Sequence, residues 1–451
     1  MKFYPQKKYS YGRFFIFSLV LFIFLLPQFN LIAQTYTDAY KPFWYLKGAG
    51  SRNTAVAYNS TAYAKGISGL ISNPALIGNI KNFQGGISIF SDKINQEARL
   101  GHSSNSFNNE SARISGLDNI GIIYPVPVYR GNFALGISYT NRAIYNNVSE
   151  SSGWEYESDQ EYRYYLSESI VEEGQLNSLN IASSIEFEKN LFLGLGLHIY
   201  NGYRNFQYNG TDKDREDLYY YDDFSLEKDI ETDYKGWNFS FGTLYQSDNF
   251  KWGIKVATPL QLSAKENSVI DTTMSWDDGY QFDSTLTFKG LEYKTMFPLD
   301  ISTGVSLNIN NIIVTMDLSL SNWNDINFNS NLEDAGGVSA DKRIEDNLSK
   351  YLTRTTNYGF GLIIPFSDFG NINCGYRLIN KPIDDLKDKY KSLNLFAAGF
   401  DYQVSQTFMF SLAYQFAYGH DQGSHYFYTD KEENYKNHRF TISTGILFNQ
   451  D

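Results

Sequence analysis

The stretch NLFLGLGLHIY, residues 190–200, alternates between two kinds of side chain. Every odd-numbered position from 191 to 199 is aliphatic, whereas the even-numbered positions from 192 to 200 carry two glycines, a histidine and two aromatic residues. An α-helix would mix these two sets, because its side chains repeat every 3.6 residues, but an extended strand keeps them on opposite faces. The stretch therefore predicts a β-strand with one apolar face.

The same alternation returns along the rest of the chain, which makes fourteen candidate strands in all. The thirteen further segments are residues 83–91, 119–126, 132–141, 179–187, 236–245, 249–257, 300–309, 311–323, 357–366, 371–379, 393–402, 407–416 and 438–448.

The connections between these segments alternate in length. Short links cover residues 187–192, 246–250, 308–311, 366–371 and 403–406, and long polar segments cover residues 142–176, 202–235, 260–298, 322–355, 379–391 and 417–437. An even number of strands, short turns on one side and long loops on the other are typical of an outer-membrane barrel, whose short turns face the periplasm. The fold class we predict is an all-β, antiparallel transmembrane β-barrel of about 14 strands.

A large soluble β-sandwich or a propeller is the alternative. A propeller would repeat a motif about every 40 to 50 residues, and the chain has no such repeat. In a sandwich the face opposite the core would carry charge, but here that face is mostly Gly, Ala, Ser, Thr and Asn. This composition favours a crowded, polar lumen behind a lipid-facing wall.

The N-terminal sequence is typical of a secretory signal peptide. Four basic residues precede the apolar run FFIFSLVLFIFLL (14–26), and a proline and small residues follow it. The run is shorter than the roughly 20 residues that a spanning helix needs, so we predict a signal peptide over residues 1–33. Its removal would take away four positive charges and no negative ones, so the net charge would change from −12 to −16. A strongly negative net charge argues against nucleic-acid binding.

Between this signal and the first strand lies GAGSRNTAVAYNSTAYAKGISGLISNPALIG, residues 48–78. The stretch resembles the N-terminal hatch of the FadL-type outer-membrane transporters of hydrophobic compounds, in which a glycine-rich segment leads into an Asn-Pro-Ala signature. Asn73, Pro74 and Ala75 match that signature. Fourteen strands is also the strand count of that family. The resemblance implies a hatch or plug over residues 34–82 and a barrel over residues 83–451.

The resemblance also implies a function: an outer-membrane channel of a Gram-negative bacterium for hydrophobic small molecules such as long-chain fatty acids, with passive diffusion gated by the hatch. The expected partners are membrane lipid, lipopolysaccharide and a hydrophobic ligand. The long loops are acidic and rich in tyrosine rather than apolar. They leave open an alternative, in which the barrel is an accessory or scaffold of a Bacteroidota-type protein secretion or surface-attachment system and binds its proteins.

The Asn-Pro-Ala tripeptide suits a gate for physical reasons. Pro74 has a fixed φ and no N–H, and it biases Asn73 toward an extended conformation. The Asn73 side chain can bond backbone groups that a plug cannot pair in a ladder. Gly66, Gly69 and Gly78 would supply hinge freedom or close packing. The alternative is that residues 73–75 form an ordinary turn.

Six polar strand residues lie opposite the apolar stripe and are predicted to face the lumen, because charge on the lipid side costs roughly 2 to 4 kcal/mol at the midplane. They are Glu186, His198, Lys255, Asp317, Arg377 and Arg439. We expect them to pair with one another and with the plug, the alternative being a substrate path.

The chain offers no catalytic pattern. It lacks a Gly-x-Ser-x-Gly elbow, a phosphate-cradling loop and a zinc helix, and it has one cysteine and five histidines. We therefore expect neither enzymatic activity nor a cofactor, and no metal site.

Overall fold

A computed structural model describes residues 43, 45–100, 108–156, 163–218, 220–330, 340–383, 388–424 and 430–448. The predicted signal peptide and residues 34–42 and 44 of the predicted hatch lie outside the described residues.

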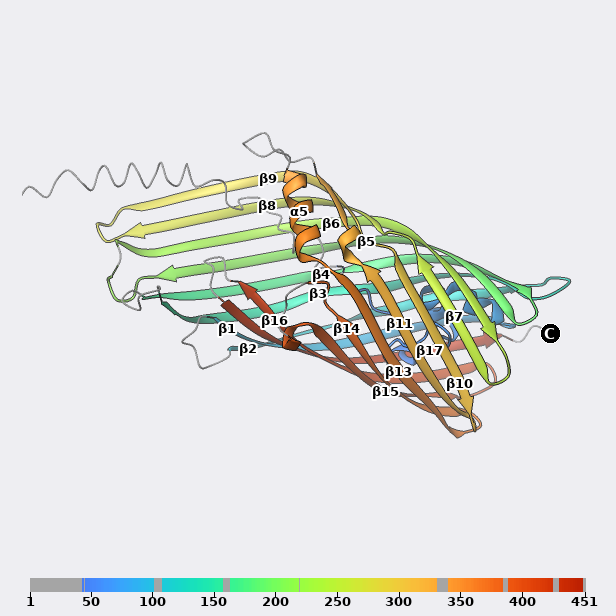
Figure 1. The fold of residues 1–451 in the computed structure, drawn as a ribbon. Helices are drawn as coiled ribbons and strands as arrows, with labels where there is room; N and C mark the ends of the chain where they lie inside the picture. Colours follow the sequence, from blue (N-terminus) through green and yellow to red (C-terminus); the bar gives the residue numbers. More distant parts are fainter. Residues whose placement is uncertain are drawn as a thin grey trace, which may run out of the picture.

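The barrel is one antiparallel sheet whose first strand pairs with its last (Figure 1). Its strands are β1 (Phe83–Leu100), β2 (Asn108–Val126), β3 (Phe133–Tyr156), β4 (Arg163–Glu188), β5 (Leu191–Lys213), β6 (Tyr221–Gln246), β7 (Phe250–Ala257), β8 (Gln261–Trp276), β9 (Gln281–Met296), β10 (Asp300–Ile309), β11 (Ile312–Asn322), β12 (Asn327–Ser330), β13 (Arg354–Ser367), β14 (Gly370–Asn380), β15 (Ser392–Gln403), β16 (Phe408–Ser424) and β17 (Asp430–Phe448).

Three wall strands are each interrupted once, so these seventeen segments build fourteen strands of the wall. β7 and β8 both pair with β6, β10 and β9 pair with β7 and β8, and β11 and β12 pair with β10 and β9. Pro259 and Pro298 lie in the first two interruptions, where the missing N–H of proline cannot serve a ladder. The short helix η3 (Trp323–Asp325) lies in the third. The predicted closed, fourteen-stranded antiparallel barrel is confirmed.

The prediction of long loops is wrong for most of these segments, which form strands instead. Residues 142–156 and 163–176, for example, continue β3 and β4 as a paired ladder. Strands β3 to β6 are 24, 26, 23 and 26 residues long, far more than the roughly 9 to 11 that cross a bilayer. Beyond the apolar zone both faces carry polar side chains, so the apolar alternation that marks a half-buried strand is lost although backbone pairing continues.

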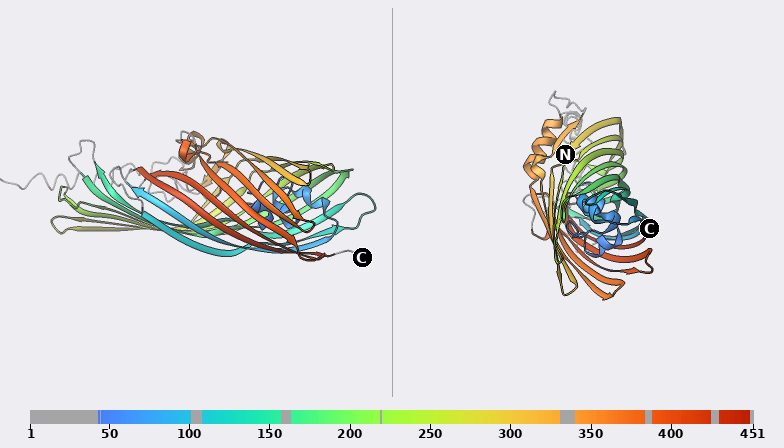
Figure 2. Two further views of the ribbon diagram at one scale, coloured as in Figure 1. Left: turned by 90° about the horizontal axis from the view of Figure 1, so that it is seen from below. Right: turned by 90° about the vertical axis from the view of Figure 1, so that its right-hand side faces the viewer.

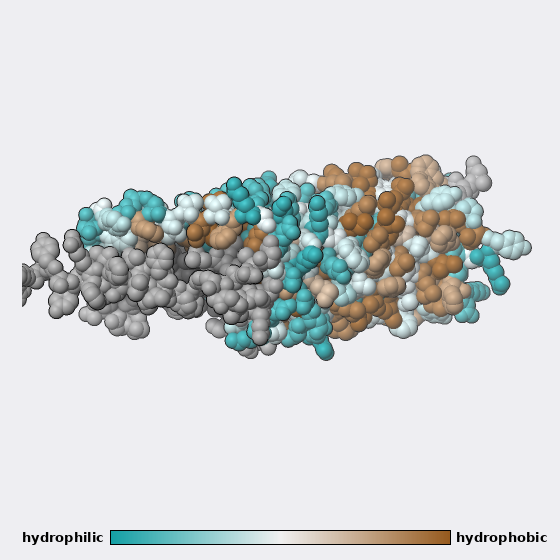
Figure 3. All heavy atoms as spheres, turned by 90° about the horizontal axis from the view of Figure 1, so that it is seen from above, coloured by the Kyte–Doolittle hydropathy of each residue, from teal (hydrophilic) through white to brown (hydrophobic). Residues whose placement is uncertain are grey.

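The apolar residues of the alternating segments point outward and form a belt at the short-turn end of the barrel (Figure 3). Leu195, Ile199, Phe241 and Ile442 are examples, each 38% to 53% exposed. Such a belt around a closed barrel is the lipid-facing surface of a transmembrane β-barrel. None of the helices among the described residues is long and apolar enough to cross a membrane.

The described N-terminal segment, residues 45–82, lies inside the barrel (Figure 2). Its helical pieces are α3 (Ser51–Ala55), η1 (Gly66–Ser68), α4 (Gly69–Ser72) and η2 (Pro74–Asn79). α3 contacts β14 to β17, and η2 contacts β3 to β6, so the segment bridges opposite walls. We call it the plug.

A cluster of aromatic and aliphatic side chains fills another part of the lumen. Tyr234 and Phe328 are 1% exposed within it, and helix α5 (Ala340–Tyr351) packs against it through Ile344 and Leu348. One further short helix, η4, spans Asp388–Tyr390.

Candidate functional site

At many of its contacts with the wall, the plug lies against glycines, which have no side chain. A Cβ at Gly194 would lie 2.3 Å from the amide nitrogen of Ala75, and one at Gly242 would lie 2.1 Å from Oδ1 of Asn73. Both distances are shorter than any contact that real Cβ atoms make. Other wall glycines that a Cβ would push into the plug are Gly86, Gly121, Gly136, Gly253, Gly304, Gly359, Gly361, Gly375 and Gly399. The small residues on the lumen face therefore make room for the plug.

Asn73 connects the plug to itself and to the wall. Its side-chain nitrogen donates to the carbonyl oxygens of Thr61 and Thr243, both at 3.0 Å, and its oxygen accepts from the Ala75 amide at 3.0 Å. The last bond caps η2, and Pro74 occupies the first turn of that helix. Asn73 is fully buried and extended, with φ at −165°.

The three plug glycines serve two purposes. Gly66 adopts a φ of +67°, which disfavours other residues. Gly69 packs against Leu76 and Ile77, and a Cβ at Gly78 would lie 2.4 Å from Oγ of Ser184 on β4. Close packing is thus the role of two of them, and backbone conformation that of the third.

Three of the six predicted lumen residues contact the plug backbone, and two of them, Asp317 and Arg377, bond the same turn of the plug. Oδ2 of Asp317 accepts from the amides of Ser60 and Thr61, at 2.8 and 2.9 Å, and from the Thr61 hydroxyl. Arg377 donates to the Tyr58 carbonyl at 3.0 Å and to Oγ of Ser319 at 3.2 Å. A wall carboxylate and a wall guanidinium therefore bond the same turn of the plug, residues 58–61.

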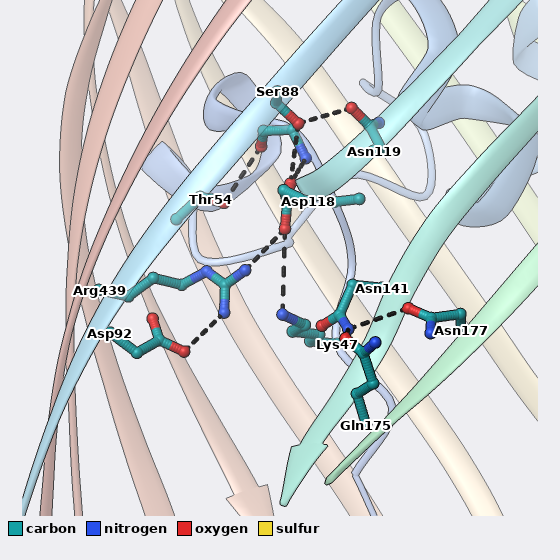
Figure 4. Close-up of polar contacts among 12 residues, drawn as sticks. Lys47, Thr54, Ser88, Asp92, Asp118, Asn119, Asn141, Gln175, Asn177 and Arg439 are labelled. Atoms are coloured by element: carbon teal, nitrogen blue, oxygen red, sulfur yellow. Dashed lines mark hydrogen bonds and ion pairs between the residues drawn. The ribbon is translucent and has the colours of Figure 1, made fainter. Parts of the chain in front are cut away.

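Arg439 lies at the centre of a buried ion-pair network (Figure 4). Its guanidinium bonds the carboxylates of Asp92 at 3.0 Å and Asp118 at 2.6 Å. Asp118 also accepts from the amide of Gly50 at 2.6 Å, and Nζ of Lys47 is 4.0 Å away. The network therefore ties the start of the plug to β1, β2 and β17.

The remaining three predicted lumen residues each have a different environment. His198 is buried between Asn180 and Ser240, with 2.8 Å from each ring nitrogen to its partner. Lys255 reaches the Ile71 carbonyl at 3.5 Å. Glu186 lies at the short-turn end, where Asn132 and the Asn190 amide donate to it, so it does not contact the plug. None of the six residues pairs with another of the six in the described contacts, and their role in a substrate path stays a prediction.

Sequence reasoning missed Asp118 and Arg142. Asp118 forms a bulge opposite Ser88 and Ile89. Arg142 forms a second bulge, because its neighbours Asn141 and Ala143 each have a partner residue on β4 and Arg142 has none there. In both places two neighbouring residues turn inward, so a break in strict alternation, such as the Asp-Asn at 118–119, was the available signal.

Two cavities adjoin the plug. The Phe43 cavity, of about 210 Å³, has an aromatic side that includes Phe297 and Trp323. Its basic residues are Arg142, Lys255 and Arg377, and Asp300 is the one acidic residue in its described lining. The Lys47 cavity, of about 280 Å³, is lined by Lys47, Arg439 and the β3 residues 142–147, and by the acidic residues Asp92, Glu172, Asp421 and Glu433.

Arg142 lines both cavities and is 7% exposed. Within the described part of the chain its guanidinium has no carboxylate partner, and its Nε has no hydrogen bond. A buried cation without a counter-charge is costly, so this position favours an anion in the cavity.

The wall opens beside the Lys47 cavity. β2 and β3 pair only from Asn119–Thr140 to Val126–Phe133, although both strands continue beyond that point. The separation begins at the two bulges, at the level where Leu117 and Tyr139 are exposed at the edge of the apolar belt. Backbone pairing between these two strands is thus lost on the long-strand side of the belt.

These features define a plugged, fourteen-stranded transmembrane β-barrel. The fold is similar to that of a FadL homologue from Pseudomonas aeruginosa (TM-score 0.62, 12% identity, 90% of this chain and 100% of that one). It is also similar to the toluene transporter TodX of P. putida (0.58, 13%, 90% and 100%) and to the toluene transporter TbuX of Ralstonia pickettii (0.55, 10%, 90% and 99%). The chain therefore has the FadL-type fold. Protein-family models and curated protein sequences give no match.

Proposed function

We propose that the protein is an outer-membrane channel for hydrophobic small molecules, and that its ligands carry an anionic head, as long-chain fatty acids do. The Phe43 cavity carries this proposal. It joins an aromatic side to three basic side chains, and Asp300 is the only carboxylate among the described residues that line it. That carboxylate, Asp300, already accepts from Ser302 and Ser321, at 3.2 and 2.8 Å. An apolar tail and an anionic head would each find matching chemistry there.

The proposed path has two parts. The unpaired edges of β2 and β3 lie beside the Lys47 cavity, and Arg142 connects that cavity to the Phe43 cavity. A ligand could thus move between the bilayer edge and the lumen without crossing the polar outer mouth. Passage to the other side requires the plug to shift, which we propose as the gate, with Asn73, Pro74 and Ala75 as its contact with β5 and β6.

Binding measurements on the protein in detergent test the ligand class. A long-chain fatty acid should bind more tightly than its uncharged methyl ester. Arg142→Gln should weaken fatty-acid binding by roughly tenfold or more, because hydrogen bonds to charged groups contribute about 1.5–3 kcal/mol. It should leave ester binding unchanged. The matched control is Lys189→Gln, which removes an exposed positive charge at the short-turn end.

Equal binding of acid and ester in every variant would contradict an anionic head and leave a channel for neutral hydrocarbons. Failure of both ligands to bind, together with no uptake of either into liposomes carrying the protein, would reject the channel.

A second candidate is the scaffold of a secretion or surface-attachment system. One observation favours it: β3 to β6 extend far beyond the apolar belt, whereas β13 to β15 have only 14, 11 and 12 residues. The wall is therefore a tall sheet on one side (Figure 1), and a partner protein could bind there. Co-purification of one defined secretion subunit, lost when the hairpin of β8 and β9 is shortened, would support this candidate over the channel.

A further inference from the structure

Three basic side chains form one row across the outer surface of the wall. Lys93 on β1 lies directly opposite His438 on β17 and directly opposite Arg113 on β2. Lys93 and Arg113 are exposed and His438 is half-buried. Like charges that face each other across strands are destabilising. The adjacent Lys93 and Arg113 therefore lower the stability of the barrel unless an anion lies between them.

Neither cation has a partner among the residues that the structure describes. Among the described residues, no carboxylate or hydrogen-bond acceptor lies within bonding distance of Lys93 or Arg113. Farther along the same strand pair, Lys436 bonds Glu97 at 2.7 Å. Lys436, beyond the row, thus has a counter-charge, whereas Lys93 and Arg113 have none among the described residues.

The row lies at the edge of the apolar belt. Ile89, Leu117 and Phe440 are 52%, 37% and 51% exposed on the belt side of it. Phe440 also lines a groove on the outer wall together with Lys93, Arg113, His438, Ser91, Tyr414 and Asp92. The hydroxyl of Tyr414 bonds Nδ1 of His438 at 2.7 Å, and the Asp92 carboxylate is bonded to Arg439. A molecule in this groove would meet apolar surface at one end and cations at the other. That is the position of a lipid whose chains lie along the belt.

The other side of the wall repeats the arrangement. Lys235 on β6 and Lys294 on β9 both lie opposite Ser263 on β8, and all three are exposed. Trp237 and Met296 are exposed on the belt side of them, at 43% and 39%. In a chain with a net charge of −12, outward-facing cations thus recur at the same edge of the belt.

We propose that the row of Lys93, Arg113 and His438, the basic row, binds the phosphate of a phosphorylated glycolipid in the surrounding outer leaflet. Phosphate offers several acceptor oxygens and a negative charge to adjacent cations. Basic clusters at the level of lipid headgroups recognise anionic lipids in this way. The proposal does not depend on what the lumen carries.

The test is lipid binding by native mass spectrometry of the full chain in neutral detergent. The probes are lipid A, lipid A with its phosphates removed, and inorganic phosphate alone. We expect lipid A to bind at least about tenfold more tightly than the dephosphorylated form, since each cation near a lipid surface contributes on the order of 1 kcal/mol. Lys93→Gln with Arg113→Gln should abolish this preference.

The matched control is Arg130→Gln with Lys189→Gln, which removes two exposed positive charges at the short-turn end. It should keep the preference. Heat-modifiable migration on a gel checks that both double variants are folded. Equal binding of the two lipids by the unmodified protein, or an unchanged preference in the variant of the basic row, would overturn the proposal. Inorganic phosphate that binds this row as tightly as lipid A would also overturn the assignment to a lipid.

Discussion

Individual glycines of the wall decide how closely the plug can approach it. Gly194 and Gly242 lie on neighbouring strands and face the plug backbone at Ala75 and the side chain of Asn73. Elsewhere in the wall a glycine such as Gly445 has room, because the nearest side-chain atom, on Met409, would lie 3.5 Å from an added Cβ. The same substitution therefore has different consequences at the two kinds of position.

We expect Gly242→Ala to displace the plug while the barrel stays folded. Its Cβ would overlap Oδ1 of Asn73, and overpacking of a close contact costs roughly 1–3 kcal/mol. The measurement is protease cleavage of the plug in the folded, heat-modifiable protein, which should become faster than in the unmodified protein. Gly445→Ala is the control and should cleave at the original rate; equal cleavage of the two variants would contradict the tight contact.

Asp212, near the far end of β5, should make local stability depend on pH. Burial raises its pKa to about 6, against the opposing effect of the hydrogen bond from Tyr221, and the nearby Asp214 and Asp223 raise it further. A carboxyl group whose pKa is raised by folding binds more protons in the folded state. Its contribution to stability is therefore full below its ordinary pKa of 3.8 and is lost as pH rises through about 6.

Amide hydrogen exchange at the outer ends of β5 and β6 measures this effect. After correction for the intrinsic pH dependence of exchange, protection there should fall between about pH 4 and pH 6. Asp212→Asn should remove that fall and leave the strand ends better protected at pH 7. A fall of the same size in the variant would show that another group is responsible.

At the scale of elements, the plug and the wall are held by different interactions. Each wall strand pairs with two neighbours along its backbone, and β1 with β17 closes the circle through eighteen residue pairs, from Phe83–Phe448 to Leu100–Lys431. The plug adds side-chain bonds and packing on the lumen side, but it contributes no strand to the sheet.

We therefore expect deletion of residues 48–78 to leave a barrel that inserts and migrates in a heat-modifiable way, because its ladders are complete without the plug. Leakage of small polar solutes from liposomes should rise, since a wall of this size encloses more space than wall side chains fill. The control is the full chain at the same protein-to-lipid ratio. Loss of insertion would identify the plug as a folding element, and unchanged leakage would contradict its role as a gate.

For the whole molecule, the apolar belt sets where the barrel lies in a bilayer (Figure 3). Phe241 is 53% exposed within the belt, and Phe282 is 45% exposed on the long hairpin of β8 and β9. The two side chains are similar in type and exposure but differ in their distance from the short turns. They therefore test the membrane level of the barrel directly.

Phe241→Arg should lower the free energy of unfolding in lipid vesicles by about 2–4 kcal/mol if its position is near the midplane. Phe282→Arg should change it by less than about 1 kcal/mol, because that side chain meets water. The measurement is denaturant unfolding of the barrel in vesicles. Equal effects of the two substitutions would contradict the assigned membrane level.

The sequence by itself determined the strand number, the closed antiparallel class and which face of each segment meets lipid. The reason is that the bilayer enforces a period-two pattern within each crossing, as in residues 190–200, where the even-numbered side chains point into the lumen. Asn73 and Pro74 also behave as local chemistry predicts, with an extended Asn73 that caps the helix after it.

Only the tertiary structure decided how far the strands continue and which charges meet. Outside the bilayer, backbone pairing needs no apolar pattern. β3 and β4 therefore remain paired through a segment whose polar sequence predicts a loop. The partners of Arg439, Asp92 and Asp118, are 347 and 321 residues away in sequence. Closure of the barrel brings them together, and Asp118 reaches them through a bulge. Pairings of that kind follow from the register of distant strands, which local pattern does not encode.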